Sequence, residues 1–229
     1  MFCITEDGTN YLFDEDLTFD EIQFPPAIDI LYCARMQLTS LRGCPPARRL
    51  ICSNNQLASL EGCPPVEELI CKHNKLTSLE FCPATVKKIN CNYNKLPNFQ
   101  GCPENLVTLK CTDNKITSLE DCPRKLERLV IDSNDLTSLK HCPPVKILDC
   151  SANFDLTSLE FCPPVYDLDI SHNSRLNRRN VFIGLDFEPH RLACRSTGLT
   201  SLKHIPRQVK ILDCRYNQII SLADCPELE

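Results

Sequence analysis

The amino-acid sequence repeats itself at short intervals along almost its whole length. Successive units begin at equivalent aliphatic residues, 19 to 24 positions apart, and each approximates L-x-C-x-x-N-x-L-T-S-L-x-x-C-P-P-x-V-x-x. A period this short indicates a solenoid, in which each unit forms one coil and buries its apolar side against its neighbours. The ten units begin at Leu31, Leu50, Leu69, Ile89, Leu109, Leu129, Leu148, Leu168, Leu192 and Leu212.

The start of each unit alternates like a short β-strand. In VEELICKH, Leu69 and Cys71 share one side, while Ile70 and Lys72 share the other. Ten such strands stacked about 4.8 Å apart predict a parallel sheet roughly 45–50 Å long. About a dozen residues then remain in each unit, too few for a helix and two corners, so the opposite side should be extended or 3-10.

The rest of the unit supplies the turn and the return. Asn follows each strand where the chain must turn, and its amide can both donate and accept hydrogen bonds, so stacked copies can satisfy buried backbone groups. The two leucines of L-T-S-L, such as Leu76 and Leu79, are predicted to point inward. The C-P-P segment favours extended geometry leading to the next strand.

These residues resemble a known repeat family. L-x-C-x-x-N-x-L, preceded by an aliphatic residue, resembles the leucine-rich-repeat signature LxxLxLxxNxL, and the short unit is similar to the class found in injected bacterial effectors and large DNA virus proteins. The likeness covers about residues 24–229. It implies a β-rich, right-handed solenoid with a parallel concave sheet and an extended or 3-10 convex side. The sequence departs from that class by placing Cys at two positions per unit that are usually aliphatic.

The segments outside the regular pattern give the domain organisation. FPPAIDILYC imitates CPPVKILDC, so residues 24–229 are predicted to form the solenoid and residues 1–23 a degenerate half-repeat that caps it. The chain stops at residues 225–229, right after half a unit, and no polar cap follows. Because solenoid ends need covering, we expect either pairing with another copy, as a homodimer, or a longer native chain.

The unit over residues 168–191 is longer than the others and lacks the C-P pair. One interpretation is a convex bulge with a short helical turn, because insertions in repeat proteins map to loops. The alternative is a recognition loop with a basic rim formed by Arg175, Arg178 and Arg179.

The chain holds 17 cysteines, of which 16 fall on two ladders. Ile131, Ile170 and Ile205 replace Cys in single coils, so we expect these positions to fill the core. Stacked thiols point the same way, too far apart for unstrained disulfides, and their spacing does not match zinc motifs. We therefore expect reduced thiols, no metal and no cofactor. The first ladder is Cys33, Cys52, Cys71, Cys91, Cys111, Cys150, Cys194 and Cys214, and the second is Cys44, Cys63, Cys82, Cys102, Cys122, Cys142, Cys162 and Cys225.

The remaining cysteine, Cys3, is predicted to be the most exposed one. No Cys/His/Asp constellation and no Gly-rich phosphate loop is visible, so we do not expect an enzyme. A net charge of −5 argues against a nucleic-acid partner, and no apolar run is long enough for a membrane span. Without an export signal, so many thiols favour an intracellular, reducing compartment: the cytoplasm, or a host's cytoplasm for a viral or effector protein.

The outward side chains of the strands provide the candidate site. An apolar strip is followed by lysines and then by acids, an arrangement that suits a protein partner of unknown identity. We expect a non-catalytic protein-interaction scaffold that binds on its concave face. The alternatives are a self-associating structural or assembly protein and an effector-type enzyme regulator. The candidate contact residues are Tyr32, Ile51, Ile70, Lys72, Lys88, Lys110, Asp149 and Asp169.

Overall fold

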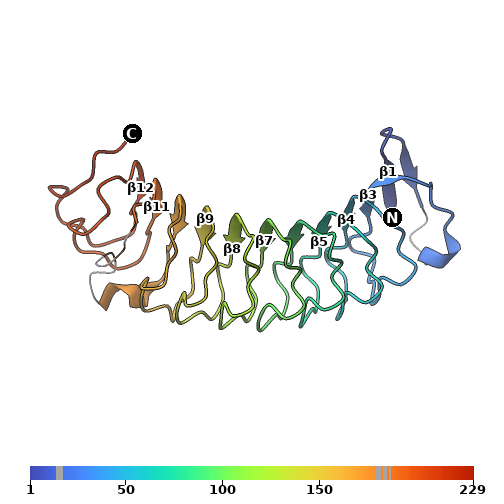
Figure 1. Ribbon diagram of the computed structural model, residues 1–229, viewed down its shortest axis with the longest axis horizontal. Coiled ribbons are helices and arrows are strands. Elements are labelled where there is room, and N and C mark those ends of the chain that lie inside the picture. The colour runs from blue at the N-terminus through green and yellow to red at the C-terminus, as the bar shows by residue number, and fades with distance from the viewer. Residues whose placement is uncertain (14–17, 179–181, 183–184, 186) are drawn as a thin grey trace.

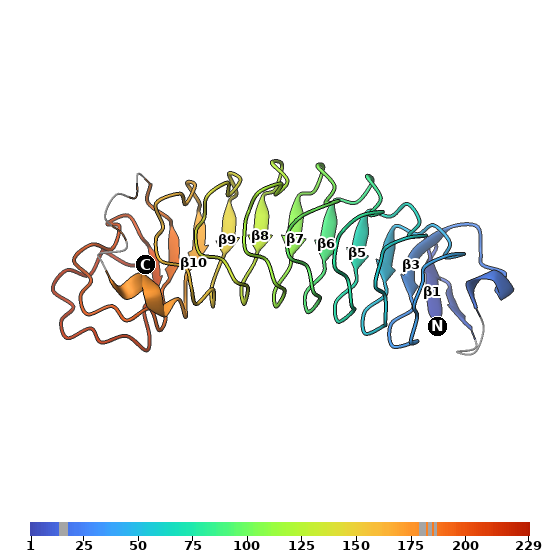
Figure 2. The ribbon, with the colours of Figure 1, turned by 90° about the horizontal axis from the view of Figure 1, so that it is seen from below.

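A computed structural model describes the chain except residues 14–17, 179–181, 183–184 and 186. The described residues form one sheet of 12 strands, in the order β12 to β3 followed by β1 and β2. Figure 1 shows these strands along the inner side of a shallow arc, with the two termini at opposite ends. Figure 2, turned by 90°, shows the coils following one another along the long axis. The predicted leucine-rich-repeat type of solenoid is confirmed.

Ten of the strands run parallel and pair in register. Leu31, Leu50 and Leu69 are Cα partners across the first three, and the equivalent residue of every later unit continues the row. Their bounds are β3 Ile28–Tyr32, β4 Arg49–Ile51, β5 Glu68–Ile70, β6 Lys88–Asn90, β7 Thr108–Lys110, β8 Arg128–Val130, β9 Ile147–Asp149, β10 Asp167–Asp169, β11 Arg191–Ala193 and β12 Ile211–Asp213.

The core lies between the sheet and the outer turns. Leu69, Cys71, Leu76 and Leu79 have no exposed surface, as the alternation and the L-T-S-L motif predict. Ile131, which takes the place of a ladder cysteine, is equally buried. The first thiol ladder therefore fills the core as predicted, except at Cys214, which is half-buried. Three of its thiols also donate to a carbonyl of the next strand, which isoleucine cannot do: those of Cys91, Cys111 and Cys150.

The second ladder differs from the prediction. Cys44 and Cys122 are buried, but the other six are only half-buried, because they lie at the outer edge where the chain leaves the core. These positions therefore border the core instead of filling it. The six are Cys63, Cys82, Cys102, Cys142, Cys162 and Cys225.

Buried asparagines link consecutive coils. The Asn114 amide donates to the carbonyl of Cys111 in its own coil, at 3.0 Å, and to that of Cys91 in the preceding coil, at 3.2 Å. Its Oδ1 accepts from the Leu96 N–H at 3.0 Å. One side chain thus satisfies backbone groups of two coils, as the sequence predicts. The same double link is made by Asn55, Asn74, Asn94, Asn134, Asn153 and Asn217.

The asparagine links are incomplete around the irregular unit. An extra residue separates Asn153 from Leu156, and the Leu156 N–H turns back to the Asn153 carbonyl at 2.9 Å. The buried Oδ1 of Asn173 consequently has no hydrogen-bond partner among the described residues. In the next unit Thr197 replaces Asn, and its hydroxyl bonds Cys194 of its own coil at 2.8 Å.

The irregular unit contains the short helical turn that the sequence predicts. This 3-10 helix, η2 (Ser174–Arg178), lies on the convex side of the arc (Figure 1). Arg175 is exposed there and pairs with Asp155 at 2.8 Å. Arg179 and the side chain of Arg178 lie outside the described residues.

The N-terminal segment is an antiparallel hairpin. β1 (Phe2–Thr5) pairs with β2 (Asn10–Leu12) and, on its other side, runs antiparallel to β3. A degenerate half-repeat, as expected over residues 1–23, would add a strand parallel to β3, whereas β1 runs antiparallel to it. The expectation for Cys3 is wrong as well: it faces the core opposite Leu31 and has no exposed surface. A 3-10 helix, η1 (Phe19–Glu21), follows the hairpin.

Candidate functional site

The concave sheet carries all eight residues predicted as contacts. Tyr32, Ile51 and Ile70 are consecutive members of one row across the sheet, and the register carries the same row on to Lys110, Asp149 and Asp169. Lys72 and Lys88 lie on the two rows that flank it. All eight are half-buried or exposed.

The hairpin extends the apolar part of this row by two strands. Phe2 is the cross-strand partner of Tyr32, and Leu12 is the partner of Phe2. The rings of Phe2 and Tyr32 stack with centroids 4.7 Å apart, and Leu12 is 85% exposed. We call the five adjacent side chains the apolar strip: Leu12, Phe2, Tyr32, Ile51 and Ile70.

Sequence reasoning missed Phe2 and Leu12 because both precede the repeat. A signal was nevertheless present: FCIT and NYL are short β-prone runs separated by a turn that contains Asp7 and Gly8. Their antiparallel pairing places alternate residues of both runs on the concave side. The apolar strip therefore spans β2, β1, β3, β4 and β5.

Next to the apolar strip lie three lysines whose charges are not neutralised by a neighbour. Among the described residues, Lys72, Lys88 and Lys110 form no ion pair. The nearby Glu68 is 3.4 Å from Arg49 instead. The middle of the concave face therefore presents uncompensated positive charge.

The C-terminal half of the face is different, because three of its acids are paired with arginines within the sheet. Arg195 lies 3.4 Å from Asp169 and 3.5 Å from Asp213. Asp167 is 3.8 Å from Arg191. Of the two predicted acidic contacts, Asp169 thus already has a partner in this chain.

Asp149 forms no ion pair with any residue that the structure describes. Burial, the main cause, raises its pKa, and the charges of Asp169 and Asp132 add to the shift. Hydrogen bonds from the Ser151 hydroxyl at 2.7 Å and the Ser151 N–H at 3.1 Å oppose it. Asp149 is therefore a carboxylate whose charge the fold disfavours.

The thiols are not activated. Burial raises the pKa of Cys33 and of Cys63 to about 12, and it also raises that of Cys71 and Cys111 in the core. A nucleophilic or metal-binding cysteine needs the opposite shift. Across the part of the chain that the structure describes, no three His, Cys, Asp or Glu side chains are grouped to hold a metal ion.

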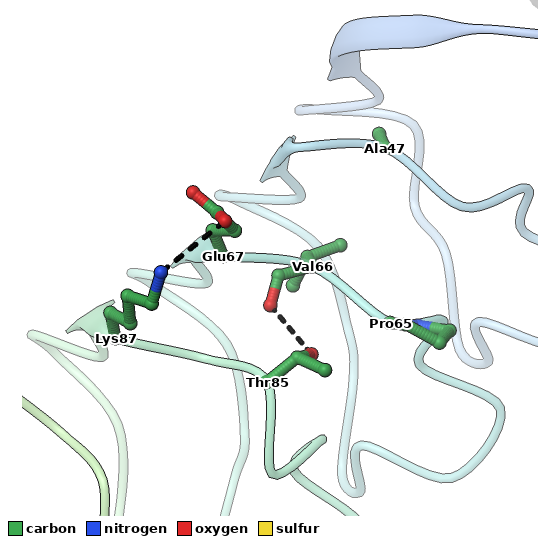
Figure 3. Close-up of a pocket in the computed structure, with 6 residues that line it drawn as sticks. All are labelled: Ala47, Pro65, Val66, Glu67, Thr85 and Lys87. Carbon is green, nitrogen blue, oxygen red and sulfur yellow. Dashed lines mark hydrogen bonds and ion pairs between the residues drawn. The ribbon is translucent and has the colours of Figure 1, made fainter.

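A pocket of about 350 Å³ opens beside the sheet, where the chain enters β4, β5 and β6 (Figure 3). Two interactions link residues that line the pocket. The Thr85 hydroxyl donates to the Val66 carbonyl at 2.9 Å, and Lys87 lies 3.4 Å from Glu67. The predicted contact residues do not line it. The lining residues are Ala47, Pro65, Val66, Glu67, Thr85 and Lys87.

Comparison with known proteins gives structural likenesses. No family model and no curated protein sequence matches the chain. Among solved structures, YopM from Yersinia enterocolitica WA-314 is similar with a TM-score of 0.53 and 26% identity, over 87% of this chain and 49% of that one. The functional domain of InlJ from Listeria monocytogenes, whose structure "includes a cysteine ladder", has a TM-score of 0.44 and 21% identity, over 79% of this chain and 57% of that one.

This chain thus spans about half the length of the YopM structure that it resembles. Within the described residues there is no helix with the length and apolar character needed to cross a bilayer.

Proposed function

We propose that this chain, which is a leucine-rich-repeat protein, is a non-catalytic module that binds a partner protein on its concave face. The observation that carries the proposal is the apolar strip, continued on the same sheet by three lysines that form no ion pair within the described part of the chain. Apolar contacts surrounded by charged groups are typical of protein-binding surfaces.

The proposed site is smaller than the set of contact residues predicted from the sequence. Its centre is the N-terminal half of the face, because Asp169 and Asp213 are already paired with Arg195 of this chain. A matching partner would place apolar side chains on the apolar strip and acidic side chains on Lys72, Lys88 and Lys110. Such opposite charges mainly speed association and select the partner.

The test compares substitutions on the two halves of one face. Ile51→Asp with Ile70→Asp places charge in the apolar strip, and Ile147→Asp, also on a half-buried outward position, is the matched control. We expect a partner captured by the unmodified chain to bind the double variant at least about a hundredfold more weakly, since central apolar contacts dominate interface energies. Equal binding by the double variant, or loss only with Ile147→Asp, would place the site elsewhere.

A second candidate function is self-association through the β12 coil. Ile220 is 95% exposed and Leu222 is 70% exposed, which is unusual for aliphatic side chains of a repeat. Light scattering after size exclusion would reveal a dimer. Dissociation by Leu222→Asp but not by Ile70→Asp would favour this assembly role over the concave-face module.

We also propose that the chain works in a reducing intracellular compartment. All 17 cysteines are unpaired, and burial, which keeps most of them protonated, suits thiols that pack and do not react. Alkylation in denaturant without reductant should modify 17 cysteines in protein taken directly from its source. A smaller number would indicate disulfides and contradict the assignment.

A further inference from the structure

The sheet ends at an open edge. β2 pairs with β1 on one side, and among the described residues no strand pairs with its other side. All three β2 residues are exposed, including Tyr11 at 40% and Leu12 at 85%. An exposed edge strand offers unpaired backbone groups to another chain.

The hairpin bonds fix which backbone groups face outward. Met1 bonds with Phe13, and Thr5 bonds with Thr9, so these are hydrogen-bonded pairs of the ladder. Hydrogen-bonded and non-hydrogen-bonded pairs alternate in antiparallel strands, so Cys3 and Tyr11 are also a hydrogen-bonded pair. The N–H and C=O groups of Asn10 and Leu12 therefore point away from β1, toward the open edge.

The N-terminal sequence that contains this edge strand carries charge of one sign. Residues 1–23 contain seven Asp or Glu and no Lys or Arg. Asp7 is exposed at the hairpin turn, where the Thr5 hydroxyl and the Thr9 N–H hold its carboxylate at 2.6 and 3.1 Å and lower its pKa. Glu21 is held in the same way by Thr18, with a lowered pKa. Both carboxylates stay charged at neutral pH.

We propose that the β2 edge binds a basic, extended segment of another protein by strand addition. The added strand bonds to the outward groups of Asn10 and Leu12, and its alternate side chains lie beside Leu12 at the end of the apolar strip. Basic residues of the segment meet the acidic N-terminal region. A second copy of β2 is the wrong occupant, because two such acidic regions repel each other. This surface is separate from the lysines of the proposed concave site, which call for acidic groups.

The experiment uses the full chain and a labelled hexapeptide of alternating Lys and Val, followed by fluorescence anisotropy. The same peptide with alternate N-methylated amides keeps its charge but cannot form the full ladder. We expect it to bind about tenfold or more weakly, since several backbone hydrogen bonds are lost. A Glu-Val hexapeptide should not bind, and Leu12→Pro, which removes an outward N–H, should weaken binding while Leu12→Thr keeps it.

Amide exchange gives a second readout, because Asn10 and Leu12 should become protected by the Lys-Val peptide. Ile51→Asp with Ile70→Asp should leave peptide binding intact, which separates failure of this inference from failure of the concave site. Equal binding of the methylated or the Glu-Val peptide would overturn the proposal. So would dimerisation of the chain that the Lys-Val peptide does not reverse and Leu12→Pro abolishes.

Discussion

Each buried asparagine serves two coils, so its removal leaves backbone groups without partners. We predict that Asn114→Ala lowers the free energy of unfolding by about 2–4 kcal/mol, because the Leu96 N–H and two carbonyls lose a buried partner. Asn173→Ala should cost less, since its Oδ1 accepts no bond among the described residues. Urea denaturation of both variants measures the difference. Equal losses would contradict the assigned roles of the two amides.

Gly62 lies where one coil closely approaches the next. A Cβ added to Gly62 would lie 2.7 Å from the backbone nitrogen of Arg42, and the residue also has φ +82°. Gly8 has nearly the same φ, +86°, but open space around it. Gly62→Ala should therefore destabilise by the strain of a positive φ, about 1–3 kcal/mol, plus the clash, and Gly8→Ala by the strain alone. Thermal unfolding of both variants would separate the destabilisation caused by the clash from that caused by the positive φ.

Two aspartates should have opposite effects on stability. Asp149 has a raised pKa in the folded state. Its contribution to folding stability is therefore greatest at low pH and is lost as pH rises through the folded-state pKa. Asp213 has a lowered pKa, chiefly because Arg215 donates to it, so its contribution is present at neutral pH and lost in acid. At pH 7, Asp149→Asn should raise the unfolding midpoint and Asp213→Asn should lower it. Two shifts of the same sign would contradict this linkage.

At the scale of elements, thiols of the first ladder should react differently in the central coils and in the β12 coil. In the native chain, Cys71 and Cys111 lie in the core with raised pKa values, while Cys214 is half-buried on the β12 coil. A disulfide reagent should label Cys214 at least about tenfold faster than the core thiols, whose reaction needs local opening. Mass spectrometry of labelled peptides gives the order. Rapid labelling of Cys71 would refute its place in the core.

The sequence predicts the strands because each unit repeats the same alternation of apolar and outward residues, which stacked parallel strands bury on one side. Leu69 and Ile70 could be assigned to opposite sides by alternation alone. The hairpin could not be obtained in this way, since Phe2 and Leu12 belong to no repeat and their position depends on antiparallel pairing. Likewise, the pairing of Asp169 with Arg195 joins residues 26 positions apart, and depends on side-chain rotamers that spacing does not determine.

At the scale of the whole molecule, the coils should be interchangeable units. Deleting residues 89–108 removes one 20-residue unit and leaves every remaining strand in register. Because each coil contacts mainly its neighbours, this variant should stay folded with a modest loss of stability. Deleting only residues 89–98 removes a strand but keeps its return segment, and should unfold much more of the chain. Circular dichroism during denaturation would compare the two.

The interrupted asparagine links have a mechanical consequence. Between β3 and β9 every pair of neighbouring coils is fastened by an amide, but on the two sides of β10 that fastening is partial or replaced by Thr197. If the ends of the molecule are drawn apart, tension acts equally on all these junctions. The solenoid should then part first at β10, releasing β11 and β12 as one segment while the N-terminal coils still resist the load.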